Sequence, residues 1–202
     1  MIPVAGVREV ARAAELLAAG EVIGLPTDTV YGVGARLDRP GAVEAIFELK
    51  GRPVDVALPV LIGRDADVDS VAAAWPRSAK MLAARYWPGP LTLVVPARPE
   101  IGALLGGTGD TVGVRAPKHR FVRNLCRTAG PLAVTSANRH GGEPCTTAEA
   151  VTEAFGGEGL ALVVDGGRCD GEPSTVADCT TSPPTLLRQG ALPWDWVLAA
   201  LR

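Results

Sequence analysis

Short apolar segments alternate with amphipathic segments along most of this chain. The apolar segments lie at residues 22–25, 58–62, 91–95, 111–115, 131–135, 160–164, 175–177 and 185–187. None of them alternates strictly between polar and apolar residues, which is the pattern of a strand with one face in water. We therefore expect strands that are covered on both faces. The order of the segments predicts an α/β fold in which helices flank a mixed sheet.

Helical periodicity fills the intervals between these strands. It predicts helices at residues 7–18, 40–50, 77–86, 119–128, 147–155 and 194–201. Gly20 follows the first of them and the pair Gly156-Gly157 follows the fifth, where glycine would end a helix. Residues 101–110 are rich in glycine, and we expect them to form a mobile loop.

The composition fits one globular domain. The chain has 202 residues, 47% of them hydrophobic and 21% charged, so a sizeable core can form. No linker or repeat divides the sequence, and we expect a single domain over residues 1–202. The apolar runs are too short to cross a bilayer and the first residues lack a signal-peptide pattern, which predicts a cytoplasmic protein without membrane contact. The net charge of −2 argues against bulk attraction to nucleic acid.

The sequence lacks metal-site spacing and the common nucleotide-binding motifs. Its thiol and imidazole residues are scattered: Cys126, Cys145, Cys169, Cys179, His119 and His140. They form neither a C-x-x-C pair nor a metal cluster, so no protein-bound metal is expected. There is no Walker A motif, and the run that begins at Gly32 has Leu37 where the third glycine of G-x-G-x-x-G belongs. A nucleotide would therefore be held by cationic and hydroxyl side chains.

Two pairs of polar residues follow predicted elements. Pro53 favours an extended conformation at Arg52, and residues two apart in such a segment point the same way. Lys50 and Arg52 can thus form a cationic pair for a polyphosphate, or they simply complement the dipole of the preceding helix. Ser136 and Asn138 follow a strand at the edge of the sheet where ligands bind in open α/β folds, or they form a polar turn.

A third polar segment, residues 26–32, also leaves a strand. Its Thr27, Asp28, Thr29 and Tyr31 could bind a small polar substrate by directional hydrogen bonds, or form an Asx or Ser/Thr turn. Arg115 stands at the end of another predicted strand. Its guanidinium could hold the carboxylate of a substrate, or only a neighbouring Asp.

Together these residues belong to seven motifs whose order is typical of a known family. The motifs are Pro26-Thr27-Asp28-Thr29-Val30-Tyr31-Gly32, Lys50-Gly51-Arg52-Pro53, Trp87-Pro88-Gly89-Pro90-Leu91-Thr92, Val112-Gly113-Val114-Arg115, Ser136-Ala137-Asn138, Ser174-Thr175-Val176 and Leu187-Arg188. On these motifs the chain resembles the YrdC-like threonylcarbamoyl-AMP synthases over almost its whole length. The resemblance implies a twisted α/β sheet with a concave, positively charged cavity.

The resemblance also implies a reaction, that of a nucleotidyltransferase joining L-threonine, bicarbonate and ATP into threonylcarbamoyl-AMP and pyrophosphate. A separate transferase complex would then modify an adenosine of certain tRNAs. Because two anions must meet, catalysis should be mainly charge neutralisation and positioning. Mg²⁺ would accompany ATP, bound largely through phosphate and water.

The resemblance assigns the site residues to three sets. Lys50, Arg52 and Arg188 would hold the triphosphate, Thr111, Ser136 and Asn138 would complete the ATP site, and Thr29, Arg115 and Ser174 would hold threonine. Of these, Lys50, Arg52, Ser136 and Asn138 are the expected catalytic residues.

The sequence departs from the family pattern in two places. Val56 and Leu61 stand where some members have Asn and His, so those substrate contacts would be absent or replaced. After Asn138 the run 139–142 has one residue more than is usual. Some relatives carry a second C-terminal domain, whereas this chain ends at Arg202, which leads us to expect the single-domain form.

Two other functions fit parts of the sequence. A related carbamoyl-adenylate enzyme could use a different acceptor, although such domains usually sit in longer chains. A non-catalytic module could bind tRNA or double-stranded RNA through Arg120, Arg123 and Arg127 on one face of the helix at 119–128, unless these residues form only a solvated face.

Overall fold

The fold is described from a computed structural model, which covers residues 3–155, 158–169 and 171–201. Its strands are β1 (Val4–Gly6), β2 (Ile23–Leu25), β3 (Gly32–Arg36), β4 (Val60–Leu61), β5 (Leu91–Pro96), β6 (Thr111–Arg115), β7 (Leu132–Ser136), β8 (Leu162–Asp165), β9 (Thr175–Asp178) and β10 (Thr185–Arg188). Its helices are α1 (Val10–Ala18), α2 (Pro40–Lys50), α3 (Arg77–Tyr86), α4 (Pro99–Leu105), α5 (Arg120–Ala129), α6 (Ala148–Phe155) and α7 (Trp194–Ala199), with a 3₁₀ helix at Asp65–Ser70.

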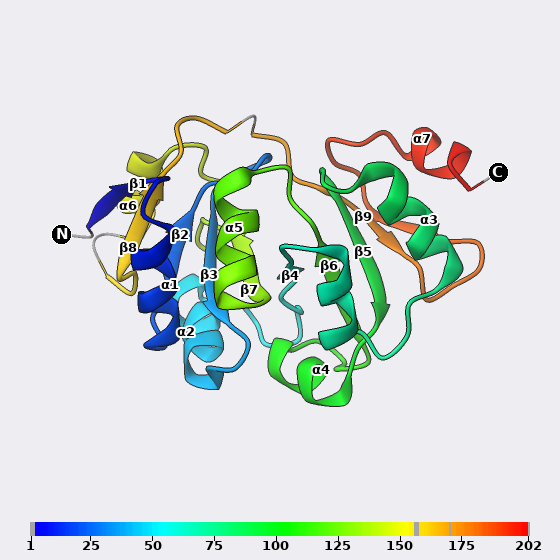
Figure 1. Cartoon of the computed structure of the whole chain (residues 1–202), viewed down its shortest axis with the longest axis horizontal. Helices are drawn as coiled ribbons and strands as arrows, with labels where there is room; N and C mark the ends of the chain where they lie inside the picture. Colours follow the sequence, from blue (N-terminus) through cyan, green and yellow to red (C-terminus); the bar gives the residue numbers. More distant parts are fainter. Residues whose placement is uncertain (1–2, 156–157, 170, 202) are drawn as a thin grey trace.

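The strands form one twisted, open sheet in the order β1-β8-β2-β3-β7-β4-β6-β5-β9-β10 (Figure 1). Strand β8 runs parallel to β1 and β2, β4 to β6, and β5 to β9, while the other neighbours are antiparallel. The predicted mixed sheet is therefore confirmed. Strand β1 and helix α7, the first and last of the described elements, lie at opposite ends of the molecule (Figure 1).

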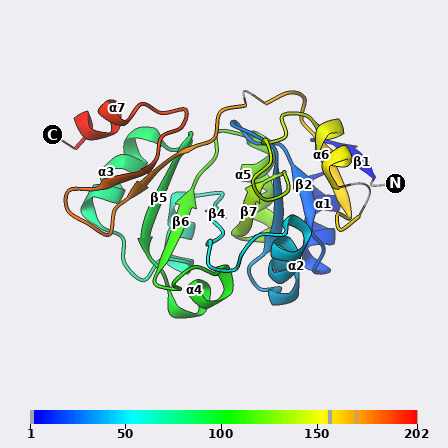
Figure 2. The same cartoon turned by 180° about the vertical axis from the view of Figure 1, so that it is seen from behind.

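Helices cover both faces of this sheet. On one face, α1 and α5 pack side by side, and their Leu17 and Phe121 join an apolar cluster with Leu132 of β7 (Figures 1 and 2). On the other face, Ile46 of α2 and Phe155 of α6 belong to a second cluster, which also includes residues of α3 and α7. Because helices cover both faces of the sheet, its strands carry apolar side chains on both sides. This explains why their sequences do not alternate between polar and apolar residues.

The bounds of α2, α3 and β6 are those predicted. Pro40 occupies the start of α2, where its missing N–H costs nothing, and the helix ends at Lys50, before Gly51, which adopts a left-handed conformation with φ 59°. The glycine pair that was predicted to end α6 lies outside the described residues. None of the described helices has the length and apolar character needed to span a bilayer.

The prediction of a loop at 101–110 was wrong in its first half, because α4 extends to Leu105. Pro99 begins this helix and Leu105 is fully buried. A Cβ on Gly102 would lie only 1.7 Å from the carbonyl oxygen of Gly109. The glycines here allow two backbone segments to approach closely. A glycine-rich composition is the same for such a close approach and for a flexible loop, so it could not tell them apart.

Strands β1 and β3 were not predicted. Strand β1 has only three residues, too few for a pattern. In β3, the side chains of Leu25 and Val134 occupy the space beside Gly32 and Gly34, and a Cβ on Gly32 would lie 2.7 Å from Cγ1 of Val134. Glycines in a strand interior mark such close approaches and weaken the sequence signal for a strand.

Candidate active site

A cavity of about 490 Å³ opens beside the middle of the sheet, lined by residues of β3 to β7, β9, β10 and their loops. Arg52, Arg115 and Arg188 all contribute to its wall. Among the described residues that line it there is no Asp or Glu. The cavity is therefore electrostatically suited to anions.

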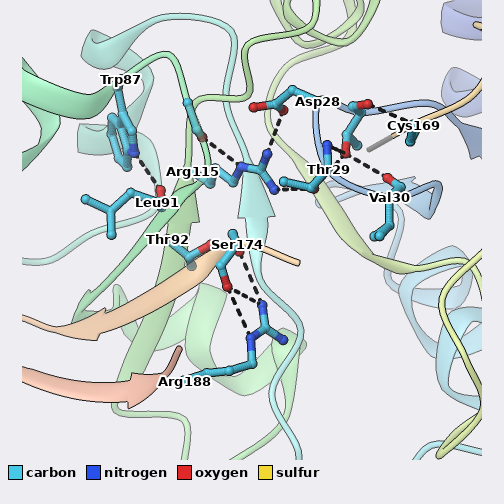
Figure 3. A network of polar contacts seen from close by, with 12 residues as sticks. Asp28, Thr29, Val30, Trp87, Leu91, Thr92, Arg115, Cys169, Ser174 and Arg188 are labelled. Carbon is cyan, nitrogen blue, oxygen red and sulfur yellow. Dashed lines mark hydrogen bonds and ion pairs between the residues drawn. The ribbon is translucent and has the colours of Figure 1, made fainter. Parts of the chain in front are cut away.

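Arg115, the last residue of β6, is the most buried of these cations. Its Nη2 donates to Oδ1 of Asp28 at 2.6 Å, its Nη1 to Oγ1 of Thr29 at 2.9 Å and its Nε to the carbonyl of Gly89 at 3.0 Å (Figure 3). Burial lowers the pKa of Arg115, and the adjacent Asp28 opposes that shift. The sequence left two partners open for this guanidinium, a substrate carboxylate or a neighbouring Asp. The structure shows the neighbouring Asp28, and Arg115 also lines the cavity, where a substrate could reach it.

Thr27 and Thr29 lie in one turn, and the direction of each hydrogen bond that their hydroxyls make can be assigned. Thr27 Oγ1 donates its hydrogen to the carbonyl of Val30 at 2.7 Å and accepts from the backbone N–H of Thr29 at 3.1 Å. The 2.9 Å contact between the two hydroxyls must therefore be donated by Thr29. Because Thr29 also accepts from Arg115, one of its lone pairs is left for a ligand.

Ser174 lies across the cavity, directly before β9, and contacts Arg188. The Arg188 Nη2 reaches the Ser174 carbonyl at 2.9 Å and its hydroxyl at 3.2 Å. The Ser174 hydroxyl also lies 2.8 Å from Oγ1 of Thr92 on β5. Figure 3 shows Ser174 and Thr92 between Arg115 and Arg188. Ser174 and Arg188 belong to one group of hydrogen bonds, and Thr29 and Arg115 belong to a second group beside it.

Lys50 and Arg52 lie together at the end of α2 but have different surroundings. Arg52 lines the cavity and donates to the carbonyls of Val56 and Ala57, each at 2.9 Å. Lys50 is only 3% exposed and is not among the residues that line the cavity. Burial, followed by repulsion from Arg52, lowers the pKa of Lys50 to about 8. The structure places one member of the predicted pair in the cavity wall and the other behind it.

The Lys50 ammonium holds the Ser136–Asn138 turn from behind. Its Nζ donates to the Ser136 carbonyl at 2.6 Å and also to the Asn138 carbonyl. Both Ser136 and Asn138 line the cavity, as does Thr111 at the start of β6. Lys50 therefore fixes the backbone that presents two of the predicted ATP residues.

Asn138 closes the loop in which the sequence departs from the family. Its Nδ2 donates to the carbonyls of Arg139 at 2.8 Å and Gly142 at 2.7 Å. Its Oδ1 is buried and has no hydrogen-bond partner among the described residues. A buried acceptor without a partner is unfavourable, so this oxygen is a natural contact for a ligand donor. The other departure involves two residues: Leu61 lines the cavity, whereas Val56 is 39% exposed.

Sequence reasoning considered a neighbouring Asp for Arg115 without identifying it as Asp28, and it missed Thr92 as the partner of Ser174. Tyr31 was noted only as a polar residue, but its hydroxyl donates to the Gly167 carbonyl at 2.8 Å and so anchors the loop before Ser174. The available signal for Asp28 was its place beside Thr29 in the motif at residues 26–32. In the described part of the chain, no group of three or more His, Cys, Asp or Glu residues could hold a metal ion.

Comparison with known proteins defines the class to which this fold and site belong. The profile of the Sua5_yciO_yrdC family, described as "Telomere recombination", matches residues 15–190. The chain belongs to this Sua5/YciO/YrdC family.

Individual relatives narrow the comparison. The chain is 42% identical over 185 residues to a threonylcarbamoyl-AMP synthase of Pyrococcus abyssi, covering 91% of this chain and 54% of the relative. It is 40% identical over 177 residues to a threonylcarbamoyl-AMP synthase of Serratia proteamaculans, covering 84% and 90% respectively. The crystal structure of P. abyssi Sua5 complexed with L-threonine superposes with a TM-score of 0.92 at 38% identity, covering 100% of this chain and 61% of that one. The chain thus spans about half the length of the Pyrococcus relative.

Proposed function

We propose that this protein is an L-threonylcarbamoyladenylate synthase, which forms threonylcarbamoyl-AMP and pyrophosphate from L-threonine, bicarbonate and ATP. The observation that carries the proposal is one cavity that combines three arginines with the hydroxyls of Thr29 and Ser174. Both substrates that must react are anionic at the reacting groups, and such a cavity neutralises both. The names of its relatives support the same reaction.

The proposed threonine subsite is formed by Thr29, Arg115 and Ser174. Three of the five N–H groups of Arg115 donate to acceptors in the described part of the chain, which leaves two for the carboxylate of threonine. The remaining lone pair of Thr29 suits the amine of threonine. Asp28 keeps the Arg115 guanidinium in this orientation.

The proposed ATP subsite uses Arg52 and Arg188 for the phosphates and Thr111, Ser136 and Asn138 for the rest of the nucleotide. The unpartnered Oδ1 of Asn138 would accept a hydrogen bond from a hydroxyl or amino group of the nucleoside. Lys50 contributes by holding the Ser136–Asn138 turn and by adding positive charge behind it. Because the described cavity wall offers no carboxylate, Mg²⁺ would be held by the phosphates and water.

The proposed reaction has two steps. The threonine amine adds to bicarbonate and water leaves, which gives the carbamate. A carbamate oxygen then bonds to the α-phosphorus of ATP while the bond to the bridging oxygen breaks, and pyrophosphate departs with the electron pair. A separate transferase would pass the threonylcarbamoyl group to tRNA, in the cytoplasm where tRNA and ATP occur.

The test is pyrophosphate release from ATP, with mass spectrometry of the product. We expect release to require both threonine and bicarbonate, and the product to have the mass of threonylcarbamoyl-AMP. Adenylate formation from carbamoyl phosphate without threonine would instead support the carbamoyltransferase alternative. Tight binding of duplex RNA without nucleotide binding would support an RNA-binding module.

A further inference from the structure

The connection between β8 and β9 joins distant parts of the sheet. Six strands separate β8 from β9 in the sheet order, and both views show the connection as a gold to orange trace along one side of the molecule (Figures 1 and 2). We call its described residues, 166–169 and 171–173, the strap. Its last residue, Pro173, lines the cavity, as does Ser174, which follows it. The course of the strap therefore determines where Ser174 enters the cavity wall.

The strap is bound to the loop that carries Thr29. The backbone N–H of Gly171 donates to the Thr29 carbonyl at 2.8 Å. The Tyr31 hydroxyl makes two further bonds, since it donates to the Gly167 carbonyl at 2.8 Å and accepts from the Gly166 N–H at 3.1 Å. One short segment thus provides both a hydroxyl of the proposed threonine subsite and the hydroxyl that binds the strap.

Tyr31 is fixed independently of the strap. Its side chain is fully buried, its N–H donates to the Cys145 carbonyl at 2.9 Å, and its carbonyl accepts from the Ala137 N–H at 2.7 Å. Burial raises the pKa of Tyr31 to about 12, so the hydroxyl keeps its proton at neutral pH. Gly166 and Gly167 are exposed in contrast. The hydroxyl is therefore a fixed point, and the strap is the part that can move when the bonds are lost.

We propose that Tyr31 is a positioning residue of the threonine subsite, because its hydroxyl holds the strap where Ser174 lies across the cavity from Thr29. The inference rests on the proposed function, which assigns Thr29 and Ser174 to threonine. Without the hydroxyl, the strap occupies this position for only part of the time, and the affinity for threonine falls in proportion. Bound threonine restores the position, so the rate at saturating threonine changes little.

The experiment compares Tyr31→Phe with Tyr86→Phe by the kinetics of pyrophosphate release. Both changes remove a hydroxyl that donates to a backbone carbonyl, and that of Tyr86 bonds to Trp196 of α7 at 2.6 Å, away from the cavity. We expect Tyr31→Phe to raise KM for threonine about fivefold to tenfold, with kcat within about twofold of the wild type. KM for ATP should stay close to that of the wild type, because Arg52 and Asn138 bond to other segments than the strap. Tyr86→Phe should leave all three constants unchanged.

Amide hydrogen exchange tests the strap without any activity. The backbone N–H groups of Cys169 and Gly171 bond to carbonyls of other loops at 2.9 and 2.8 Å, so their exchange reports movement of the strap. Tyr31→Phe should accelerate this exchange about fivefold, since these two bonds remain and only those of the hydroxyl are lost. Tyr86→Phe should not change it.

Gly167→Ala is a second variant that leaves the Tyr31 hydroxyl in place. Gly167 has a φ of 79°, and a Cβ there would meet nothing within 4 Å, so the change strains the backbone of the strap without a collision. It should raise both KM for threonine and the exchange of the strap, as Tyr31→Phe does.

Two kinetic outcomes would overturn the proposal. One is a wild-type KM for threonine in both strap variants, Tyr31→Phe and Gly167→Ala. The other is a lower kcat with an unchanged KM, which is the result of losing folded enzyme and not of misplacing Ser174. If Tyr31→Phe does not fold, Gly167→Ala decides. A wild-type protein that releases no pyrophosphate would refute the proposed function, whereas unchanged exchange in the strap would refute the role of Tyr31 whatever the reaction.

Discussion

At the scale of single residues, burial distinguishes two ion pairs with the same shortest N–O distance. Asp28–Arg115 and Asp38–Arg36 both have an N–O distance of 2.6 Å. The side chains of the first pair are 14% and 7% exposed, and those of the second are 52% and 24% exposed. Removing one partner of a buried pair leaves an uncompensated charge, whereas an exposed partner is simply hydrated.

We therefore expect Asp28→Ala to lower the free energy of unfolding by about 3 kcal/mol. Asp38→Ala is the matched control and should lower it by less than about 1 kcal/mol. Urea unfolding measures both values. Equal losses in the two variants would show that burial does not determine the strength of the Asp28–Arg115 pair.

Lys50 provides a prediction for the dependence of nucleotide binding on pH. With its pKa near 8, the ammonium loses its charge as the pH rises through that value, and its bonds to the Ser136–Asn138 turn weaken. Affinity for α,β-methylene-ATP should fall about tenfold between pH 7 and 9.5. Lys80→Met on the exposed surface of α3 should keep this profile, while Lys50→Met should bind weakly at every pH. A wild-type affinity that is constant over this range would contradict the role of Lys50.

Lys50 should affect stability in the opposite direction: as the pH rises, nucleotide affinity falls but its contribution to stability increases. The pKa of an unfolded lysine is about 10.4, so the unfolded chain binds the proton more tightly than the folded protein does. Between pH 8 and 10, roughly the interval between the two values, the Lys50 contribution to the free energy of unfolding therefore rises with pH. Urea unfolding of the wild type and of Lys50→Met at pH 8 and pH 10 isolates this contribution. A difference in the free energy of unfolding between the two proteins that stays constant with pH would contradict it.

At the scale of secondary-structure elements, α4 depends on one glycine. A Cβ at position 102 would collide with the Gly109 carbonyl, which is backbone and cannot rotate away. We expect Gly102→Ala to lower the free energy of unfolding by about 1–3 kcal/mol. Gly41→Ala in α2, where a Cβ meets nothing within 4 Å, should be neutral or slightly stabilising. Urea unfolding of both variants tests this, and a neutral Gly102→Ala would show that the segment can move apart.

At the scale of the whole molecule, the cavity joins distant parts of the sheet. Arg52 follows α2, next to the β3–β7 half, whereas Arg188 ends the edge strand β10. A ligand that bridges them should stabilise the folded protein, by about 2.7 kcal/mol at a concentration 100 times its Kd. We expect α,β-methylene-ATP to raise the midpoint of thermal unfolding and adenosine, which lacks phosphates, to raise it much less. Equal effects of both would place the affinity in the nucleoside and not in the arginines.

The sequence predicted helices better than it predicted loops and edges. The apolar faces of α2 and α3, with Pro40 at the start of α2 and Pro53 shortly after its end, are local signals and gave the right bounds. The glycines of α4 and β3 misled because each is required by a close contact with a distant segment. Such a contact leaves no periodic pattern in the sequence.

By itself the sequence determined the α/β class, the mixed sheet and a set of predicted site residues that all line the cavity except Lys50, because these follow from local patterns and from the order of motifs. Only the tertiary structure decided how those residues interact. Arg115 finds Asp28 from 87 positions away, and Lys50 reaches the Ser136 carbonyl from 86 positions away, behind the cavity wall. The physical reason is that a side chain takes its partners from the neighbouring strands and loops that the sheet order brings together, and that order is not a local property of the chain.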